Sequence, residues 1–162
     1  GERCGLPRDA GGGGRDRALA GQRRIAAASA KLGQADINLV TLPGCGGAQR
    51  VRRLAGRGAA LELCVTGAAI SAQGAYELGL LHRVVAIDQL ETETMALARQ
   101  LAAAAPQALG GILDAVLIGG DCGIDAGLDY ETQVFAVCAT TDDMREGTAA
   151  FLERRKPEFR GR

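Results

Sequence analysis

The stretch Lys31–Arg50, KLGQADINLVTLPGCGGAQR, holds the densest local pattern in the chain. A short apolar run, INLV, leads into a Pro-Gly turn, and a helical pattern begins directly behind the glycines at Gly46. Proline fixes one dihedral of a turn, and glycines permit positive φ and a close approach of the backbone. Such a loop directs free amides at an anion or a polarised oxygen. A plain strand-to-helix turn would use the same residues, so this loop alone leaves both interpretations open.

Around this stretch, the first half of the sequence predicts short strands and helices. RIAAA (24–28) and RVVAI (83–87) favour strands, the second because its residues are mostly β-branched. Residues 1–24, with a GGGG run and six arginines, favour a loop or a frayed terminus. The other predicted elements are a turn at 31–33, helices over 46–55 and 58–65 that end at Gly67, and a helix capped by Ser71 and closed by Gly79.

The second half of the sequence predicts almost only helix. Apolar residues from Leu90 to Leu101 recur at helical spacing, so we expect an amphipathic helix from a cap at Asp88 to about Ala105. Pro106 can start the next helix. Strands that all lie early in a helix-rich chain favour an α/β fold whose sheet comes mostly from residues outside this sequence. Three further helices are expected over 107–118, 124–138 and 142–155, the last capped by Thr141 or Asp142.

Composition excludes several classes of protein. The 162 residues suit one domain, 47% of them are apolar, and no apolar run reaches the ~20 residues of a membrane span. Five irregularly spaced cysteines with a single histidine predict no metal site, so we expect reduced, mostly buried thiols and a capped surface or core role for His82. Five aromatics without interleaving argue against nucleic-acid binding. No secretory signal is readable, so we expect a cytoplasmic location, and six basic residues between Arg145 and Arg162 suggest an anion contact.

A longer segment, Arg24–Arg50, resembles the active-site segment of the crotonase superfamily of enoyl-CoA hydratases and isomerases. The superfamily pattern is R-I-A-x-x-x-A-x-F-G-x-P-E-x-x-L-G-x-x-P-G-x-G-G-x-Q-R, and the chain reads R-I-A-A-A-S-A-K-L-G-Q-A-D-I-N-L-V-T-L-P-G-C-G-G-A-Q-R. The similarity continues through VTGAAISAQGAYELGLLHRVV and DDMREGTAAFLERRKPEF, to about Arg162. It implies an α/β, crotonase-like (ClpP/crotonase) fold, incomplete in this chain, with a helical C-terminal region.

The resemblance also implies a domain organisation and partners. Residues 1–23 would be an irregular or degraded remnant of the oxyanion-loop and helix region, 24–105 a partial crotonase core, and 106–162 a C-terminal helical oligomerisation region. The implied assembly is a homo-oligomer, a trimer or a dimer of trimers. The implied small-molecule partner is an acyl-CoA substrate; neither nucleic acid nor membrane is expected as a partner. Coenzyme A thioester would be the substrate, and no metal or other cofactor is expected.

Two carboxylates are implied as the catalytic acid and base. Adding water to an enoyl thioester needs a base to take a proton from water and an acid to protonate the α-carbon. Asp36 stands at the glutamate of the pattern, and Asp16 lies twenty residues earlier, the spacing of the superfamily's two carboxylates. Aspartate is one methylene shorter, which withdraws each group by more than about 1 Å, and such a misplacement can cost about 10²-fold in rate. A solvated turn or cap aspartate remains the alternative at both positions.

Five further residues receive roles from the resemblance alone. Gly13 would be one of two backbone oxyanion donors, and the other has no counterpart in this chain. Gly44 resembles the glycine whose amide positions the catalytic water. Phe135 and Phe151 match positions that line the acyl pocket, although a phenylalanine on an apolar helix face also suits a plain core. Arg154 matches a lysine near the CoA phosphates, although a solvated cation at a helix end fits equally.

The implied function is an enoyl-CoA hydratase/isomerase-type enzyme that performs syn hydration of 2-enoyl-CoA in fatty-acid β-oxidation or related acyl-CoA metabolism. Two alternatives stay open. One is a non-catalytic or truncated crotonase-like subunit kept for assembly, which would form oligomers without binding acyl-CoA. The other is a crotonase-fold acyl-CoA hydrolase or decarboxylase, which substrate profiling would separate from a hydratase.

Overall fold

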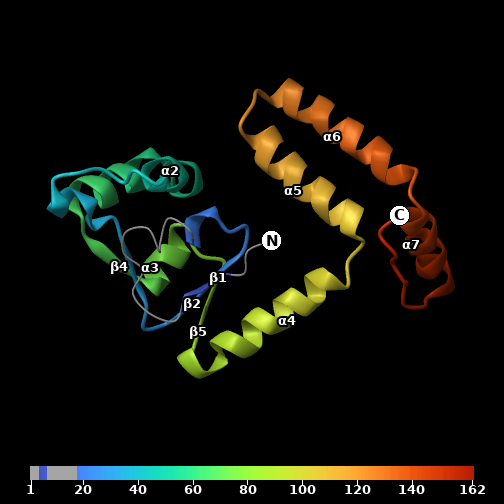
Figure 1. Ribbon diagram of the computed structural model, residues 1–162, viewed down its shortest axis with the longest axis horizontal. Helices are drawn as coiled ribbons and strands as arrows, with labels where there is room; N and C mark the ends of the chain where they lie inside the picture. The colour runs from blue at the N-terminus through green and yellow to red at the C-terminus, as the bar shows by residue number, and fades with distance from the viewer. Residues whose placement is uncertain (1–3, 7–17) are drawn as a thin grey trace. The chain divides into compact units, whose positions relative to one another are not determined.

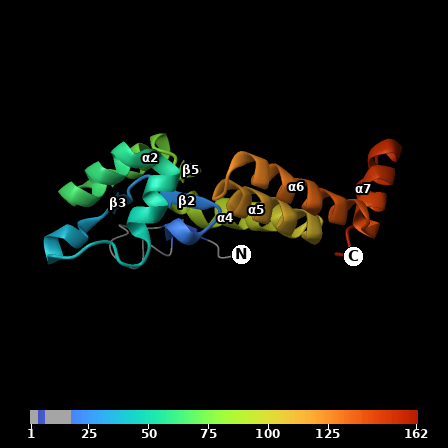
Figure 2. The same cartoon turned by 90° about the horizontal axis from the view of Figure 1, so that it is seen from above.

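The computed structural model describes residues 4–6 and 18–162 (Figures 1 and 2). The chain divides into two compact units, residues 1–96 and 97–162. The first unit contains every strand among the described residues, together with helices, and the second is helical apart from its connections and the C-terminal tail after Glu153. The prediction that the C-terminal half is almost all helix is therefore confirmed.

A small parallel sheet lies in the first unit. Its strands β1 (Cys4–Leu6), β2 (Arg24–Ala27) and β5 (Arg83–Val85) pair in the order β1-β2-β5, and both pairings are parallel. The central strand, β2, is buried at all four residues, as expected of a parallel strand covered on both faces. The predicted strands at 24–28 and 83–87 are confirmed. The loop predicted for the opening residues is wrong at β1, because pairing with β2 holds this three-residue segment extended.

A two-stranded antiparallel ribbon joins β3 (Lys31–Gly33) to β4 (Ala69–Ser71). The strands approach closely at Gly33, where a Cβ atom would lie 2.9 Å from the Cα atom of Ala69. Only glycine fits without a shift of the backbone. The turn predicted at residues 31–33 is wrong, because these residues form β3. Three residues are too few to show a strand pattern in the sequence, and β3 forms because the distant strand β4 pairs with it.

Short helices complete the first unit. The helix α2 (Gly47–Thr66) breaks at Gly56, where φ is 83° and ψ is 170°, so two helical segments meet at a kink, in agreement with the two predicted helices. Ser71 caps α3 (Ala72–Glu77) as predicted, since its hydroxyl accepts a hydrogen bond from the Gly74 amide at 3.0 Å. The predicted cap at Asp88 is wrong, because Asp88 lies within a 3-10 turn. The remaining helices are η1 (Ala35–Leu39), η2 (Ile87–Gln89) and α4 (Leu90–Ala102).

The core of the first unit consists of leucine, alanine and valine side chains. The alanines let the helices pack close to β2. On the surface, an ion pair between Arg83 and Glu93 joins β5 to the start of α4. The buried cluster comprises Leu19, Ala26, Ala30, Leu32, Val51, Ala60, Leu63, Ala72, Ala75, Leu80 and Leu81.

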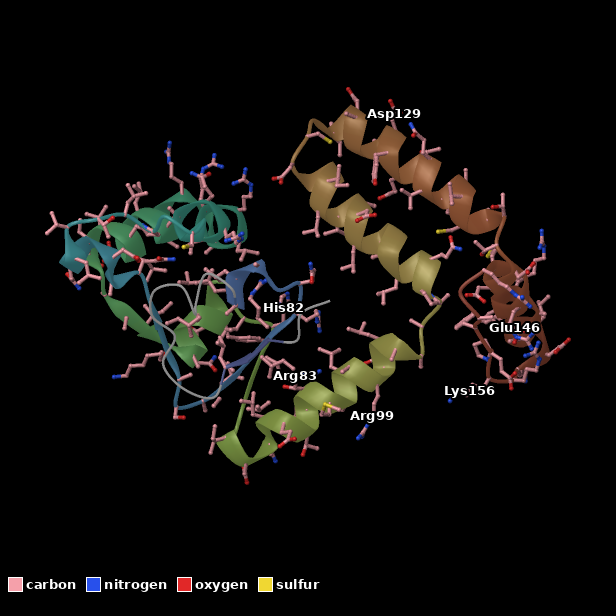
Figure 3. The ribbon with its side chains drawn as sticks, in the orientation of Figure 1. His82, Arg83, Arg99, Asp129, Glu146 and Lys156 are labelled. Atoms are coloured by element: carbon pink, nitrogen blue, oxygen red, sulfur yellow. The ribbon has the colours of Figure 1, made fainter. Side chains whose placement is uncertain are left out.

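Arg24 and His82 connect the starts of β2 and β5. The buried Arg24 guanidinium donates from Nε to the Leu80 carbonyl at 2.5 Å and from Nη1 to the Gly21 carbonyl at 2.7 Å. The His82 amide donates to the Arg24 carbonyl at 2.9 Å, and the Arg24 amide donates to His82 Nδ1 at 3.1 Å. Burial and the nearby cations of Arg24 and Arg23 lower the pKa of His82. His82 (Figure 3) therefore has the structural role expected from the sequence.

The second unit is built from three helices, α5 (Pro106–Gly120), α6 (Ile124–Ala139) and α7 (Asp142–Glu153). Figures 1 and 2 both show α5 and α6 side by side. Pro106 occupies the first turn of α5, and the Thr141 hydroxyl caps α7 by accepting from the Met144 amide at 3.1 Å, both as predicted. Among the described residues, no single helix is long and apolar enough to cross a membrane. One bent pair of helices, 87–102 and 106–120, has the length and composition of a membrane span only when the two are taken together.

The cysteines of the described side chains are free. Cys45 and Cys122 are exposed, and Cys64 and Cys138 are half-buried. No disulfide joins these four cysteines, and their reduced state stays a prediction. The expectation that most of them are buried is wrong, because Cys45 and Cys122 lie in the loops that precede α2 and α6, and Cys64 and Cys138 are only half-buried.

A buried carboxylate holds the C-terminal residues against the start of α7. Asp143 is 4% exposed, and its two oxygens accept hydrogen bonds from the Arg160 amide at 2.7 Å and the Gly161 amide at 2.8 Å. Beside it, Glu146 (Figure 3) accepts from the Arg155 guanidinium at 2.6 and 2.8 Å and from the Glu158 amide at 2.9 Å. These bonds lower the pKa of Glu146 to about 2. Arg155, one of the basic residues suggested as an anion contact, is thus paired within the chain.

The tail attachment is tested by Asp143→Asn. The asparagine amide keeps one acceptor oxygen and places an NH₂ donor against a backbone N–H, so we expect the attachment to weaken by about 1–3 kcal/mol. Native-state hydrogen exchange should show faster exchange at the amides of residues 160 and 161. The matched control is Asp142→Asn, since Asp142 is exposed and its carboxylate forms ion pairs with the side chains of Arg145 and Arg162. Equal protection in both variants would contradict the attachment.

Candidate active site

The segment that follows β3 presents Asp36 on a closed turn. The buried Gln34 ends the ribbon, and η1 then places the half-buried Asp36 in its first turn. Two backbone hydrogen bonds close η1, from the Val40 amide to the Ile37 carbonyl at 3.0 Å and from the Thr41 amide to the Asp36 carbonyl at 3.2 Å. The carboxylate therefore projects from a hydrogen-bonded turn and has a defined backbone position.

The turn η1 rests on the C-terminal end of α2. At Gly67, the residue that ends α2, a Cβ atom would lie 2.7 Å from Ile37 Cγ2 and 3.1 Å from Asn38 Nδ2. Gly67 has φ 64°, so both its backbone conformation and its lack of a side chain permit this contact. Ile37 and Asn38 thus fix η1 on α2, and the position of Asp36 follows from that contact.

The loop after η1 leads to the N-terminal end of α2. Pro43 is buried and Gly44 is exposed. The Arg50 guanidinium, from the first turn of α2, donates to the Cys45 carbonyl at 2.7 Å and holds the loop against the helix. A Cβ atom on Gly44 would meet only the Leu42 carbonyl oxygen, at 3.8 Å, so the space beside this glycine is open. A ligand can therefore approach the backbone at Gly44.

The other predicted site residues lie elsewhere. Asp16 and Gly13 fall outside the described residues. Phe135 on α6, Phe151 on α7 and Arg154, which ends α7 with φ 56°, all belong to the second unit and are exposed. The structure thus brings Asp36 and Gly44 together on one segment of the first unit. The plain-core interpretation of the two phenylalanines is wrong within the described residues, since neither is buried.

The two phenylalanines line different hollows of the second unit. Phe135 lines an apolar groove between α5 and α6, next to Ile112 and Val116. Phe151 lines a second apolar hollow with Met144 and with Phe159 from the tail. The sequence analysis did not predict a role for Phe159. The only sequence feature that could have indicated one is its place in KPEF, at the end of the segment that resembles the superfamily. The ring of Phe159 lies 3.4 Å from the Cβ position of Gly147 on α7, where the tail attachment places it.

Charge around the candidate site is predominantly positive. In the first half of α2, Arg50, Arg52, Arg53 and Arg57 carry four cations, and the whole helix contains only one acid, Glu62. Within the part of the chain that the structure describes, no group of three His, Cys, Asp or Glu side chains is placed to hold a metal ion. The segment offers the Asp36 carboxylate for proton transfer and loop amides for hydrogen bonding, and Arg50 at the start of α2 adds a cation that favours an anionic ligand.

Comparison with known proteins identifies the family. Residues 9–162 match the enoyl-CoA hydratase/isomerase family, and the chain belongs to it. The chain is 40% identical over 139 residues to the short-chain-enoyl-CoA hydratase of Clostridioides difficile, covering 86% of this chain and 90% of that protein. It is 37% identical over 148 residues to the crotonyl-CoA hydratase of Syntrophomonas wolfei, covering 91% of this chain and 57% of that protein.

A solved structure agrees with the fold. The chain superimposes on enoyl-CoA hydratase subunit I from Geobacillus kaustophilus with a TM-score of 0.93 at 41% identity, covering 96% of this chain and 61% of that chain. The predicted crotonase-like fold and the family assignment are therefore confirmed. Against this structure and the Syntrophomonas protein, the chain spans about three fifths of the length of its relative.

One residue of the candidate site has an unfavourable backbone conformation. Val40 ends η1 with φ 56° and ψ 36°, in the left-handed region, and its side chain is 96% exposed. An L-residue in this region loses roughly 1–2 kcal/mol through contact of its Cβ with the backbone, and β-branched residues are rare there. Because Val40 is exposed, packing offers no compensation.

We therefore expect Val40→Gly to raise the free energy of unfolding by about 1 kcal/mol, since the relieved contact exceeds the roughly 0.5–1 kcal/mol of backbone entropy that glycine loses on folding. Urea denaturation measures the change. Thr41→Gly is the control, because Thr41 is exposed and lacks a positive φ, and this variant should be destabilised. A Val40→Gly protein no more stable than the parent would show that the left-handed conformation does not persist in solution.

Proposed function

We propose that the protein containing this chain hydrates short-chain 2-enoyl-CoA thioesters. The observation that carries the proposal is the placement of Asp36: a carboxylate on the closed turn η1, followed by an open glycine loop, at the glutamate position of the superfamily segment. The named activities of the Clostridioides and Syntrophomonas relatives support the same substrate class. The arginines of α2 suit a ligand that carries phosphates.

The proposed reaction is an addition of water across the double bond. Asp36 takes a proton from water as the water oxygen bonds to the β-carbon, and the electron pair moves onto the thioester oxygen. The amide of Gly13 stabilises that oxygen, and the amide of Gly44 orients the water. Asp16 then protonates the α-carbon. Proton transfers and an addition complete the reaction, so it requires no cofactor, and the coenzyme A thioester enters as substrate.

The residues of the second unit have proposed roles in binding the substrate. Phe135 and Phe151 offer exposed aromatic surface to the acyl part, and Arg154 offers a cation to the CoA phosphates. We further propose that the protein acts in the cytoplasm, in fatty-acid β-oxidation or related acyl-CoA metabolism. The four free thiols support a reducing compartment.

We also propose a homo-oligomer, a trimer or a dimer of trimers, that forms through the second unit. Within α5, α6 and α7, which are described throughout, only Asp143 and Ala150 are buried. So large an exposed apolar surface is typical of an interface, and a second copy of the chain can cover it. Apart from Phe135 and Phe151, which are proposed to bind the substrate, the exposed apolar side chains on these helices are Ile112, Val116, Leu117, Ile118, Ile124, Leu128, Val137, Met144 and Leu152.

The role of Asp36 is tested by Asp36→Asn in the protein expressed from its complete coding sequence. Removing a general base typically lowers the rate by about 10²–10⁴-fold, so we expect kcat for crotonyl-CoA hydration to fall by at least about 10²-fold. Loss of the conjugated-thioester absorbance measures the rate. Asp88→Asn is the matched control, because Asp88 is an exposed aspartate in the other 3-10 turn of the same unit. Full activity of the Asp36 variant would overturn the proposal.

The assembly is tested by size-exclusion chromatography with light scattering. The expected mass is three or six times that of one subunit, and Val116→Glu should lower it, because a charge on the exposed face of α5 opposes burial against another copy. Leu61→Glu, on α2 in the first unit, is the control and should leave the mass unchanged. A monomeric parent protein would contradict the assembly. Oligomers that bind no acyl-CoA in calorimetry would favour the non-catalytic subunit.

A further inference from the structure

The turn η1 has three faces, and two of them contact the end of α2. A 3-10 helix has three residues per turn, so residues i and i+3 lie on one face. Ile37 and Asn38 lie on two different faces, and both contact the end of α2 at Gly67. The third face carries Asp36 and, one turn later, Leu39. The side chain of Leu39 is 77% exposed, so it does not share the contact with α2.

The segment that follows Asp36 exposes apolar side chains. Between residues 35 and 49, Asp36 is the single charged residue of the sequence. After Leu39 the chain continues with the exposed side chains of Val40 and Leu42. The Asp36 carboxylate is thus followed directly by accessible apolar surface. This combination suits a ligand that places a reacting polar group beside a hydrocarbon group.

We propose that Leu39 determines the acyl-chain preference of the enzyme. The inference rests on the proposed hydratase function, in which Asp36 acts on water at the β-carbon. The carbons beyond the β-carbon form the alkyl chain of the substrate. Leu39 lies one turn after Asp36 on the same face of η1, so the alkyl chain reaches the Leu39 side chain. Leu39 contacts these carbons and favours longer chains by burying apolar area against them.

The experiment compares crotonyl-CoA with trans-2-octenoyl-CoA as substrates of the protein expressed from its complete coding sequence. In Leu39→Ala, the kcat/KM for octenoyl-CoA relative to crotonyl-CoA should fall about tenfold, the usual effect of removing a few apolar contacts from a pocket. Leu39→Met keeps the apolar volume and should restore the ratio. Leu61→Ala is the matched control, because Leu61 is a leucine of the same unit that is 57% exposed on α2.

The outcomes separate this inference from the proposed function. An unchanged ratio in Leu39→Ala, with hydration retained, would overturn the role of Leu39 and leave the hydratase proposal standing. An equal loss for both substrates would also overturn it, since it would indicate a role in the fold or the assembly. A parent protein that hydrates neither substrate would overturn the proposed function and this inference together.

Discussion

The close approach of Gly33 to Ala69 is the contact on which the candidate site depends. It pairs β3 with β4, and Asp36 follows three residues after the pair, while α3 follows directly after β4. A side chain at Gly33 would separate the strands and shift η1 from the end of α2. The Ala72 amide also donates to the Ala30 carbonyl at 2.9 Å, so the ribbon is held at its far end as well. The close approach at Gly33 and the contact of η1 with Gly67 together position the carboxylate.

Elements with local signals could be predicted from the sequence. Ser71 and Thr141 cap their helices with their own hydroxyls, and Pro106 starts α5, so a few adjacent residues contain all the required information. The strands β1, β3 and β4 have three residues each and form through partners far along the chain, which no local pattern reveals. The attachment of the tail is of the same kind, since the Asp143 carboxylate binds amides that follow it by seventeen and eighteen residues.

The resemblance names the residues of the candidate site, and the structure adds their environment. The resemblance placed Asp36 and Gly44 on one segment, and the structure adds that the segment is a 3-10 turn resting on Gly67. Besides alanine in place of proline at Ala35, two departures from the superfamily pattern fall within this turn: aspartate replaces glutamate at Asp36, and valine replaces glycine at Val40. The structure shows why glycine suits the second position, because the residue there adopts a left-handed conformation.

The valine also changes the surface beside the carboxylate. Glycine at this position would relax the backbone and leave no side chain, whereas Val40 adds an exposed apolar group next to Leu39. The left-handed conformation is maintained because two hydrogen bonds close the turn and because Ile37 and Asn38 are fixed on α2. A conformation that is unfavourable at one residue can persist where its neighbours determine the backbone. In this turn, the same neighbours hold Asp36, so the constraint that strains Val40 is the one that positions the carboxylate.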